Sequence, residues 1–552
     1  MTGIIFRMLE YMKKLHENAI VYGCVCILST LIFIVIYGWK ILDVTYTDWL
    51  MYGTDLTQHY LGWKAYRLSQ WSFPLGLIDN LSYPFKVSII YTDSIPLLAV
   101  PCKVLSRILP QEFQYFGLWG LGCYILQGVL AAHILGKFTQ KKWLRIIGAV
   151  LVCFTPVVLQ RMYYHSALAG QWVLFIGIGL LLERQNEVDN KKLYKAVLWM
   201  ALLSSLIHMY FVLMNGIILI GICLKIYLEK KDWKTVFYLL LEYILIVLLV
   251  VGVLGGFSGG IASSKEGLGD YAFNLNGFVN PYGAAEGTAV IFKNLPIYAM
   301  WADEGYTYLG AGTIFILVCA VIIFCTVTVK TTSRSYLTKQ ALPILVTIII
   351  SLGFAASPRV AWGNHLLFEI PLPNIVREMW AIFRATGRVA WVAMYIIIFV
   401  SLIQMSKLEK RGICEVLLTI SVIIQVFDLS NMIRQKHTIY AETYMYESPL
   451  QEAIWNEIAS DPDIKHIIYV SDFNIFEKFT FTQFALENGM TTNDFYFARS
   501  NTERIDNYTE EMLQARPNDS IFIFGVEDGD LCQKYDLEYD VVGKYVIGTT
   551  GR

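Results

Sequence analysis

Charged residues are scarce in this chain. Only 16% of its 552 residues are Asp, Glu, Lys or Arg, while 56% are hydrophobic. A soluble globular protein carries roughly 25% charged residues. The composition therefore excludes an ordinary soluble domain and favours a protein built for lipid. The formal net charge of −1 gives no reason to expect nucleic acid as a partner.

The patterns that identify common catalytic and metal sites are also missing. The sequence contains no P-loop, zinc signature, dinucleotide-binding fingerprint or nucleophile elbow. The ten cysteines show neither metal-site nor disulfide spacing, and we interpret them as small buried side chains. The first apolar segment is too long for a signal peptide and has no cleavage site, so we expect no cleavable signal.

Long hydrophobic runs, in contrast, are abundant. The first predicted span covers about residues 20–42, and the others lie near 115–136, 146–160, 168–182, 193–207, 209–228, 234–256, 307–329, 341–357, 389–406 and 413–428. Residues 95–109 are too short for a comfortable span and contain Pro, Lys and Arg, which predicts a re-entrant or interfacial segment. The sequence thus predicts an all-α polytopic domain over residues 1–430, with about eleven transmembrane helices.

The basic residues predict an orientation for these spans. Lys and Arg cluster in alternate short loops, at 137–145, 184–192, 230–234, 330–339 and 407–411. Because cytoplasmic loops carry the excess of Lys and Arg, we expect a cytoplasmic N-terminus. The loops at about 43–114 and 257–306 then lie outside the cell. Residues 431–552 also lie outside and alternate helix-like with strand-like runs, which predicts a small extracytoplasmic α/β domain.

The first outer loop carries candidate site residues on one predicted helix. Apolar positions over residues 56–71 recur at helical spacing, which predicts a helix lying along the membrane surface. This helix would present Asp55 at the rim of a cavity. The carboxylate has three interpretations: a general base, a ligand of a divalent metal ion, or a solvated helix cap. The same helix holds three candidate substrate ligands: His59, Trp63 and Arg67.

Other outer segments supply further candidates. In FRATGR, a spacing of four would place Arg384 and Arg388 on one helical face, where they could grip a phosphate or simply reach the interface. Glu304 and Tyr306 stand in EGYTYLGAG, where a solvated loop acid is the alternative to a substrate contact. The short loop RMYYHSA contributes Arg161 and His165, and the alternative for the histidine is a structural role.

Four short sequence strings occur along the chain in an order that resembles the order found in a known protein family. They are the stretch from Asp55 through QHYLGWKAYR, then LSYPFKVSIIYTDSIPL, EGYTYLGAG and FRATGR. Over about residues 20–430 the chain is similar to GT-C fold membrane glycosyltransferases, and more specifically to a bacterial YfhO-like branch. The resemblance implies that Asp55 activates the acceptor hydroxyl as base or metal-linked group. It also implies that Arg384 and Arg388 hold the lipid-linked phosphate.

The resemblance implies an enzyme of the hexosyltransferase type in the plasma membrane. It would move a sugar from a polyprenyl-phosphate donor to a cell-surface glycan, teichoic acid or protein. Mn²⁺ or Mg²⁺ stays open as a cofactor, because the loop RMYYHSA lacks the carboxylate that many members carry there. The main alternative is a transporter or flippase of lipid-linked glycans, for which ionisable groups near the membrane midplane are expected. A scaffold with a partner-binding tail is the third reading.

Overall fold

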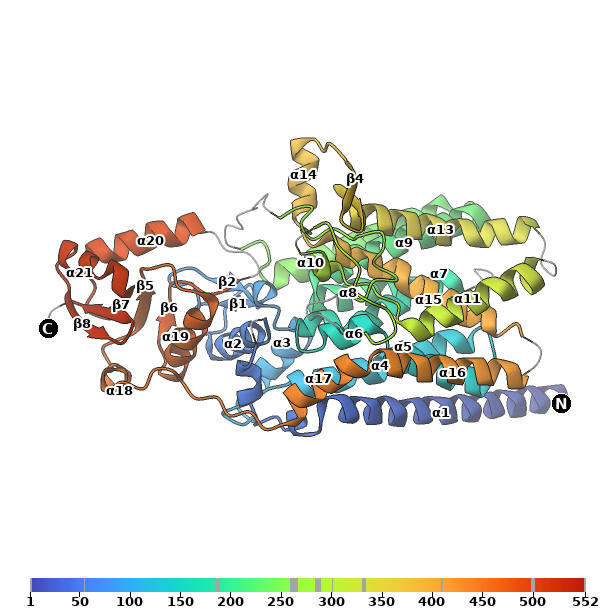
Figure 1. The fold of residues 1–552 in the computed structure, drawn as a ribbon, viewed down its shortest axis with the longest axis horizontal. Coiled ribbons are helices and arrows are strands. Elements are labelled where there is room, and N and C mark those ends of the chain that lie inside the picture. Colours follow the sequence, from blue (N-terminus) through green and yellow to red (C-terminus); the bar gives the residue numbers. More distant parts are fainter. Residues whose placement is uncertain are drawn as a thin grey trace.

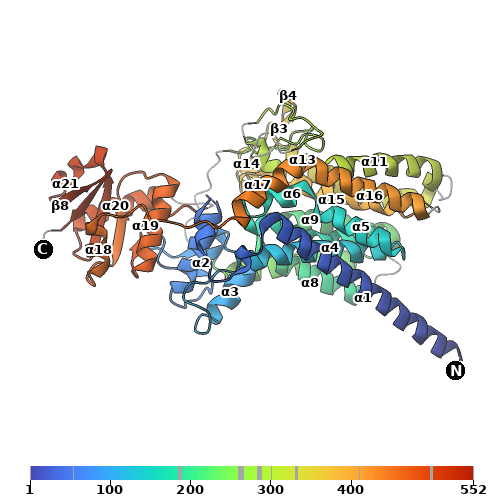
Figure 2. The ribbon, with the colours of Figure 1, turned by 60° about the horizontal axis from the view of Figure 1, so that its bottom comes forward.

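The computed structural model describes residues 2–53, 55–183, 189–258, 267–282, 289–299, 301–329, 334–408, 411–497 and 502–550. A bundle of long helices forms one part of the molecule, and a small α/β domain forms the opposite end (Figure 1). Between them lies a compact layer built from the segment that follows the first helix. The N-terminus lies at the far end of the bundle from the C-terminus (Figures 1 and 2).

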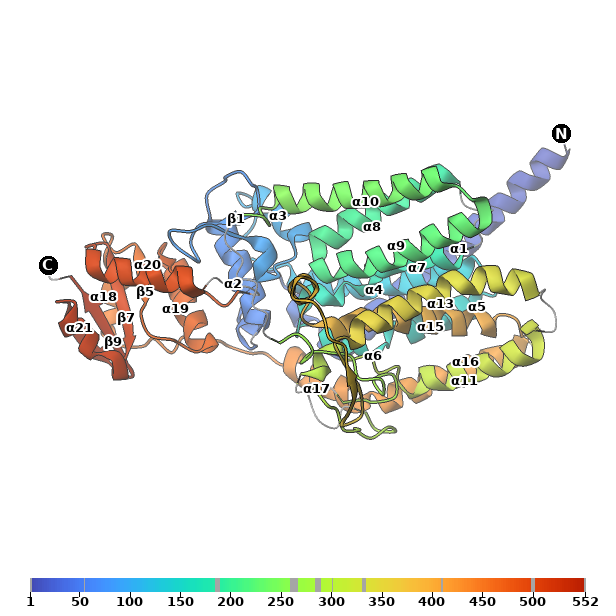
Figure 3. The same cartoon turned by 90° about the horizontal axis from the view of Figure 1, so that it is seen from above.

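The bundle consists of helices that run along a common direction (Figure 3). They are α1 (Thr2–Tyr37), α4 (Phe116–Gly136), α5 (Lys142–Cys153), α7 (Leu174–Leu182), α8 (Asn190–Ile207), α9 (Met209–Lys230), α10 (Trp233–Val253), α11 (Ala311–Ile323), α13 (Arg334–Ala356), α15 (Trp391–Met405) and α16 (Arg411–Asp428). Each predicted span overlaps one of these helices. Within the described residues, seven helices are long and apolar enough to cross a membrane, and an eighth if α16 and α17 (Ser430–Ala441) form one bent span.

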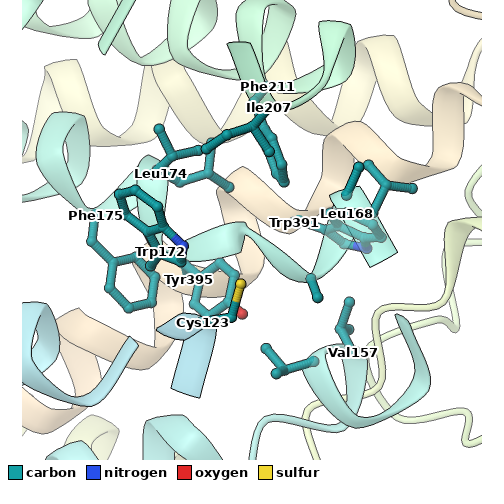
Figure 4. Close-up of a cluster of buried hydrophobic side chains, with 14 of the residues drawn as sticks. Cys123, Val157, Leu168, Trp172, Leu174, Phe175, Ile207, Phe211, Trp391 and Tyr395 are labelled. Atoms are coloured by element: carbon teal, nitrogen blue, oxygen red, sulfur yellow. The ribbon is translucent and has the colours of Figure 1, made fainter. Parts of the chain in front are cut away.

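Burial distinguishes the central helices from the peripheral ones. In the apolar segment Thr386–Met405, which contains α15, 83% of the residues are buried, against 28% in α10. Around α15, Trp172, Phe175 and Tyr395 pack into an aromatic cluster (Figure 4). Gln127 donates a hydrogen bond of 3.0 Å to the Tyr395 hydroxyl, which satisfies this buried polar group. The segment that leads into α15 is therefore held at the centre of the protein.

The layer between bundle and α/β domain contains α2 (Asp55–Leu68), β1 (Leu77–Ile78), β2 (Val87–Ser88), the 3₁₀ turn η3 (Ile89–Thr92) and the nine-residue helix α3 (Pro96–Val104). The prediction that α2 lies along the membrane surface is wrong. Ten of its fourteen residues are buried, because α2 packs against η3, α3 and helix α19 of the α/β domain. Covered on several sides, it has no single apolar face to offer to lipid.

Several short elements close the end of the bundle that faces this layer. They are α6 (Pro156–Arg161), η4 (Ser166–Ala169), η5 (Gln171–Val173), η7 (Ala302–Gly305), the antiparallel hairpin of β3 (Arg359–Trp362) and β4 (His365–Glu369), α14 (Asn374–Ala381) and η9 (Thr386–Ala390). The hairpin and α14 project sideways from the bundle (Figure 1). A π-helical turn, η8 (Phe324–Thr328), extends α11.

The C-terminal domain is a five-stranded sheet with helices, as the alternating pattern of the tail predicts. Its elements are α18 (Ala453–Ser460), β5 (His466–Tyr469), α19 (Ile475–Glu487), β6 (Thr491–Thr492), α20 (Thr502–Ala515), β7 (Ser520–Gly525), η10 (Val526–Asp528), α21 (Asp530–Lys534), β8 (Glu538–Val542) and β9 (Tyr545–Thr549). The strand order is β6-β5-β7-β9-β8. The first three strands are parallel, and β9 and β8 are antiparallel to their neighbours.

Candidate functional site

A buried carboxylate, Glu304, lies at the centre of the candidate site. Its Oε2 is 2.9 Å from Nη1 of Arg161 and 2.6 Å from Nη2 of Arg388. Arg161 is fully buried and also donates to the Glu304 carbonyl oxygen at 2.7 Å. Burial raises the pKa of Glu304, but the two guanidinium charges outweigh burial and hold this pKa well below its ordinary value. The interpretation of Glu304 as a solvated loop acid is therefore wrong.

Two glycines allow Glu304 to reach Arg388. A Cβ on Gly305 would lie 2.8 Å from the Cα of Gly387, so the backbones of η7 and η9 are in direct contact there. Only residues without a side chain permit such an approach. The strings EGYTYLGAG and FRATGR, which are distant in sequence, thus meet at this glycine contact and bring a carboxylate and a guanidinium together.

His165 links Glu304 to Asp55. Its Nδ1 lies 2.8 Å from Oδ2 of Asp55, and its Nε2 lies 3.5 Å from Oε1 of Glu304. Burial lowers the pKa of His165, but the carboxylates of Asp55 and Glu304 outweigh burial and raise it. Burial likewise raises the pKa of Asp55, and the charge and hydrogen bond of His165 more than reverse this shift. Asp55 is an ionised, largely buried carboxylate, so its interpretation as a solvated cap is wrong.

A second imidazole–carboxylate pair lies beside the first. Nε2 of His208, at the junction of α8 and α9, is 3.4 Å from Oδ1 of Asp93. Asp93 follows η3 in a left-handed conformation with φ of 51°. Burial raises the pKa of Asp93, but the charge of His208 and its hydrogen bond hold that pKa below its ordinary value. Three of the carboxylates in the site, those of Asp55, Asp93 and Glu304, are therefore ionised, and each has a cationic or imidazole partner.

These groups open onto a cavity of about 930 Å³. Its polar lining comes from Asp55, Asp93, Tyr164, His165, His208, Tyr210, Asp303, Glu304, Glu378, Arg384 and Arg388. Its apolar lining, called the apolar wall below, comes from Ile90, Ile207, Met209, Val251, Met379, Ile382 and Phe383. Ile475 and Tyr496 line the cavity from the α/β domain. This mixed lining suits a ligand that has both a charged and an apolar part.

The two arginines of FRATGR both line the cavity, but they do not share a helical face as the spacing predicts. The helical turn η9 begins at Thr386, after a non-helical Ala385, so the chain changes direction between the two side chains. Arg388 is buried against Glu304, whereas Arg384 is exposed with its guanidinium 5.6 Å from the Tyr271 ring. Arg384 has no carboxylate at ion-pair distance among the described residues.

Several predicted substrate ligands lie outside the cavity. Trp63 donates to the carbonyl of Phe113 at 3.0 Å, and Arg67 donates to the carbonyls of Gln111 and Pro110. Both side chains therefore tie α2 to the loop after α3. Tyr306 is buried below the site, where its carbonyl accepts from Trp391. Arg161 is also outside the cavity wall and contacts it through Glu304, the Asp303 carbonyl oxygen and the Tyr164 ring.

His59 lies behind His165, with ring centroids 6.4 Å apart. It is fully buried, and neither ring nitrogen has a hydrogen-bond partner within the described residues. Burial lowers its pKa to about 4, so the ring is neutral. This histidine is one turn along α2 from Asp55 and forms packing behind the site.

The described residues of the site are not arranged as a site for Mn²⁺ or Mg²⁺. Among the described residues, no group of three or more His, Cys, Asp or Glu side chains is arranged to hold a metal ion. The reason is visible in the pairing: Glu304 is neutralised by two guanidiniums and Asp55 by an imidazole. A cation would have to displace positive groups that are already in place.

Many lining residues are not among the sequence-based candidates for the site, and His208, Tyr210 and Tyr496 are three of them. His208 is an ionisable residue between two apolar runs, and such a position is itself a signal of function in a membrane helix. Tyr210 follows it and lies with its ring 4.9 Å from the Arg388 guanidinium carbon. Tyr496 comes from the α/β domain, and no local pattern indicates that it reaches the bundle.

The family model described as Domain of unknown function (DUF6311) matches residues 26–430, and the model of its C-terminal domain matches residues 454–550. The chain belongs to this family. No curated protein matches it in sequence.

Solved structures with a similar course of the chain include the archaeal oligosaccharyltransferase AglB from Archaeoglobus fulgidus, in complex with an inhibitory peptide and a dolichol-phosphate. That likeness has a TM-score of 0.47 and 10% identity, and it covers 96% of this chain and 74% of that one. An Archaeoglobus fulgidus oligosaccharyltransferase in complex with Zn and sulfate has a TM-score of 0.45 and 11% identity. It covers 92% of this chain and 68% of that one.

Proposed function

We propose that this member of the DUF6311 family is a GT-C-like membrane glycosyltransferase, near the YfhO-like branch that its sequence strings resemble. It moves a sugar from a polyprenyl-phosphate donor to an acceptor hydroxyl on the extracytoplasmic face of the cell membrane. The observation that carries the proposal is one cavity that combines an ionised carboxylate, a guanidinium with no carboxylate partner among the described residues, and apolar side chains.

Asp55 is the proposed general base. The acceptor hydroxyl oxygen forms a bond to the anomeric carbon while its proton passes to the Asp55 carboxylate. The bond between the anomeric carbon and the phosphate oxygen breaks, and its electron pair leaves on the lipid phosphate. His165 keeps Asp55 ionised at neutral pH through the contact of 2.8 Å. A single displacement of this kind inverts the anomeric centre and needs no covalent intermediate.

Arg384 is the proposed primary ligand of the donor phosphate. Its guanidinium is exposed at the cavity, whereas the charge of Arg388 is shared with Glu304. Guanidinium groups bind phosphate through paired hydrogen bonds and stabilise charge that develops on the leaving group. Arg388 orients Glu304 through their ion pair, and its positive charge adds to the attraction for the donor phosphate.

The apolar wall supports a lipid-linked donor. Helix α14 runs across the direction of the bundle helices (Figure 1). Its Ile375 and Met379 side chains are 72% and 68% exposed, as is 52% of Ile382 just beyond it. Met379 and Ile382 also line the cavity. In the proposal, the exposed apolar side chains of α14 lead the lipid chain toward the cavity, and such a helix suits the membrane interface.

The test is consumption of polyprenyl-phosphate sugars by the purified chain in nanodiscs. Asp55→Asn should slow consumption at least about a hundredfold, as expected for the loss of a general base. Asp48→Asn is the matched control, because Asp48 belongs to the same loop but does not line the cavity. Equal rates for wild type and Asp55→Asn would remove Asp55 from catalysis. Addition and chelation of Mn²⁺ and Mg²⁺ should leave the rate unchanged if Asp55 acts alone.

A further inference from the structure

A second cavity of about 920 Å³ lies in the C-terminal α/β domain. One side is formed by the segments after β5 and β6, including Ser471, Asp472 and Asp494. Helix α20 forms the other side with Asp506 and Glu510, and α21 closes one end. The cavity is thus nearly as large as the first one and is built from different elements.

Its position in the sheet is one where α/β domains bind ligands. The chain passes from β5 through α19 to β6 on one side of β5, and then through α20 to β7 on the other side. The connections therefore reverse direction at β5. In open α/β sheets the crevice outside the carboxyl ends of the strands, at such a reversal, is the usual binding place.

The wall chemistry indicates the class of ligand. Four carboxylates line the cavity, from Asp472, Asp494, Asp506 and Glu510, against three cationic side chains among the described residues, Arg384, Lys478 and Lys534. Lys478 is moreover paired with Asp494 at 2.6 Å. Aromatic rings lie among these groups: Phe495, Tyr496, Phe497 and Tyr535. Carboxylates accept hydrogen bonds from hydroxyls and repel phosphates, and aromatic faces pack against the C–H faces of sugar rings.

The two cavities adjoin each other. Arg384, Ile475 and Tyr496 line both of them. The backbone of Tyr496 is also held by the first outer loop, because Nε2 of Gln58 donates to its carbonyl oxygen at 2.7 Å. Gln58 lies on the first turn of α2 with Asp55. A ligand held in the second cavity could therefore extend past Tyr496 toward the Asp55 carboxylate.

We propose that the second cavity binds the acceptor and that this acceptor is a neutral, hydroxyl-rich glycan. This inference rests on the proposed glycosyl transfer and narrows its acceptor class, since a teichoic acid would bring phosphates against four carboxylates while Arg384, at the boundary, is occupied by the donor phosphate. The glycan lies along the carboxyl edge of β5 and β6 and presents its terminal hydroxyl at the Arg384–Tyr496 boundary.

Binding can be measured without donor, on the full chain in nanodiscs. Labelled protein is applied to an array of neutral oligosaccharides and a ribitol-phosphate oligomer, and the best neutral ligand is then titrated by calorimetry. Asp506→Asn and Asp472→Asn should each weaken its binding about tenfold, as expected for a lost charge-assisted hydrogen bond. Both side chains are exposed, so neither change threatens folding. Glu511→Gln, on the same helix as Asp506 but outside the cavity, should bind like wild type.

The inference is overturned if no neutral oligosaccharide is retained, if the ribitol-phosphate oligomer binds more tightly, or if the two cavity variants bind like wild type. Hydrolysis of the donor in the absence of acceptor is followed separately. If the wild-type protein consumes donor but binds no neutral glycan, the acceptor assignment is refuted and the glycosyltransferase proposal is not. Absence of any donor consumption, with glycan binding as expected, would refute the glycosyltransferase proposal instead.

Discussion

Nδ1 of His165 lies 2.8 Å from the carboxylate of Asp55, although the two residues belong to different loops of the bundle. The same imidazole faces Glu304 and Arg388 through its other nitrogen. Through this contact the proposed base, Asp55, is linked to the buried ionic cluster of His165, Glu304 and Arg388. A substitution in this cluster should therefore change the position or the pKa of Asp55.

The first prediction concerns the pH dependence of stability. The raised pKa of His165 means that its ion pairs stabilise the fold fully below about pH 6.5, the ordinary value, and that this stabilisation is lost as pH rises through the raised pKa. Asp55 and Glu304 remain ionised in this range because their pKa values are lowered. His165→Gln should therefore unfold at a lower temperature than wild type near pH 6, and the difference should shrink toward pH 9.

Thermal unfolding in detergent at several pH values measures this difference. His365→Gln is the control, because His365 is exposed on β4 away from the cluster. A gap between wild type and His165→Gln that is constant with pH would contradict a charged His165.

The second prediction concerns the glycine contact. In Gly387→Ala the new Cβ would lie 2.7 Å from the Cα of Gly305 and 2.8 Å from the carbonyl of Tyr271. Backbone atoms cannot yield cheaply, so we expect a loss of stability of about 1–3 kcal/mol and a displaced Glu304. Unfolding temperature and donor consumption should both fall. Gly353→Ala, where the new Cβ meets open space, should be neutral or slightly stabilising. Equal behaviour of the two variants would show that η7 and η9 are not held by this contact.

The third prediction assigns the donor phosphate to Arg384. Arg384→Gln should raise the KM for the lipid-phosphate donor about tenfold or more, since a charged hydrogen bond to phosphate is lost. Arg384→Lys should recover part of this loss because it restores the charge without the paired geometry. Steady-state kinetics on the donor provide the measurement. Arg377→Gln serves as control, because Arg377 is exposed on α14 and does not line the cavity. An unchanged KM in Arg384→Gln would leave the phosphate to Arg388.

The fourth prediction concerns the outer face of α14. Ile375→Asp places a charge on a side chain that is 72% exposed and, in the proposal, faces lipid. The variant should use a long-chain polyprenyl donor poorly but a water-soluble short-chain donor as wild type does. The ratio of kcat/KM for the two donors is the relevant quantity. A parallel loss with both donors would indicate damage to the fold, and no loss would show that α14 does not guide the lipid.

Part of the site is readable from the chain alone. Five ionisable residues of the site lie next to apolar runs: Asp55, His165, Glu304, Arg384 and Arg388. An ionisable side chain in such a position is costly and therefore indicates a functional role. Their pairing is not readable, because each partner lies in a different loop and the contacts depend on how the helices pack. The spacing of Arg384 and Arg388 misleads for a local reason, since a non-helical residue interrupts the assumed helix.

For α2 and the C-terminal domain too, the sequence predicts the elements but not their contacts. Helical periodicity correctly indicates a helix after Asp55, but its apolar residues suit a buried environment as well as a lipid surface. The packing of α19 on α2 decides between these environments. The contribution of Tyr496 to both cavities likewise has no local signature.

Hydropathy and periodicity along the chain predict that it is rich in apolar helices, that a small α/β domain follows, and which loops carry ionisable side chains. Hydropathy and periodicity are local properties, and they survive in any packing of the chain. Three relations are visible only once the chain is folded. Glu304 forms ion pairs with two arginines, Asp55 forms an ion pair with His165, and the two cavities share lining residues. These relations depend on contacts between segments that are distant in sequence, and such contacts cannot be predicted from hydropathy or periodicity within one segment.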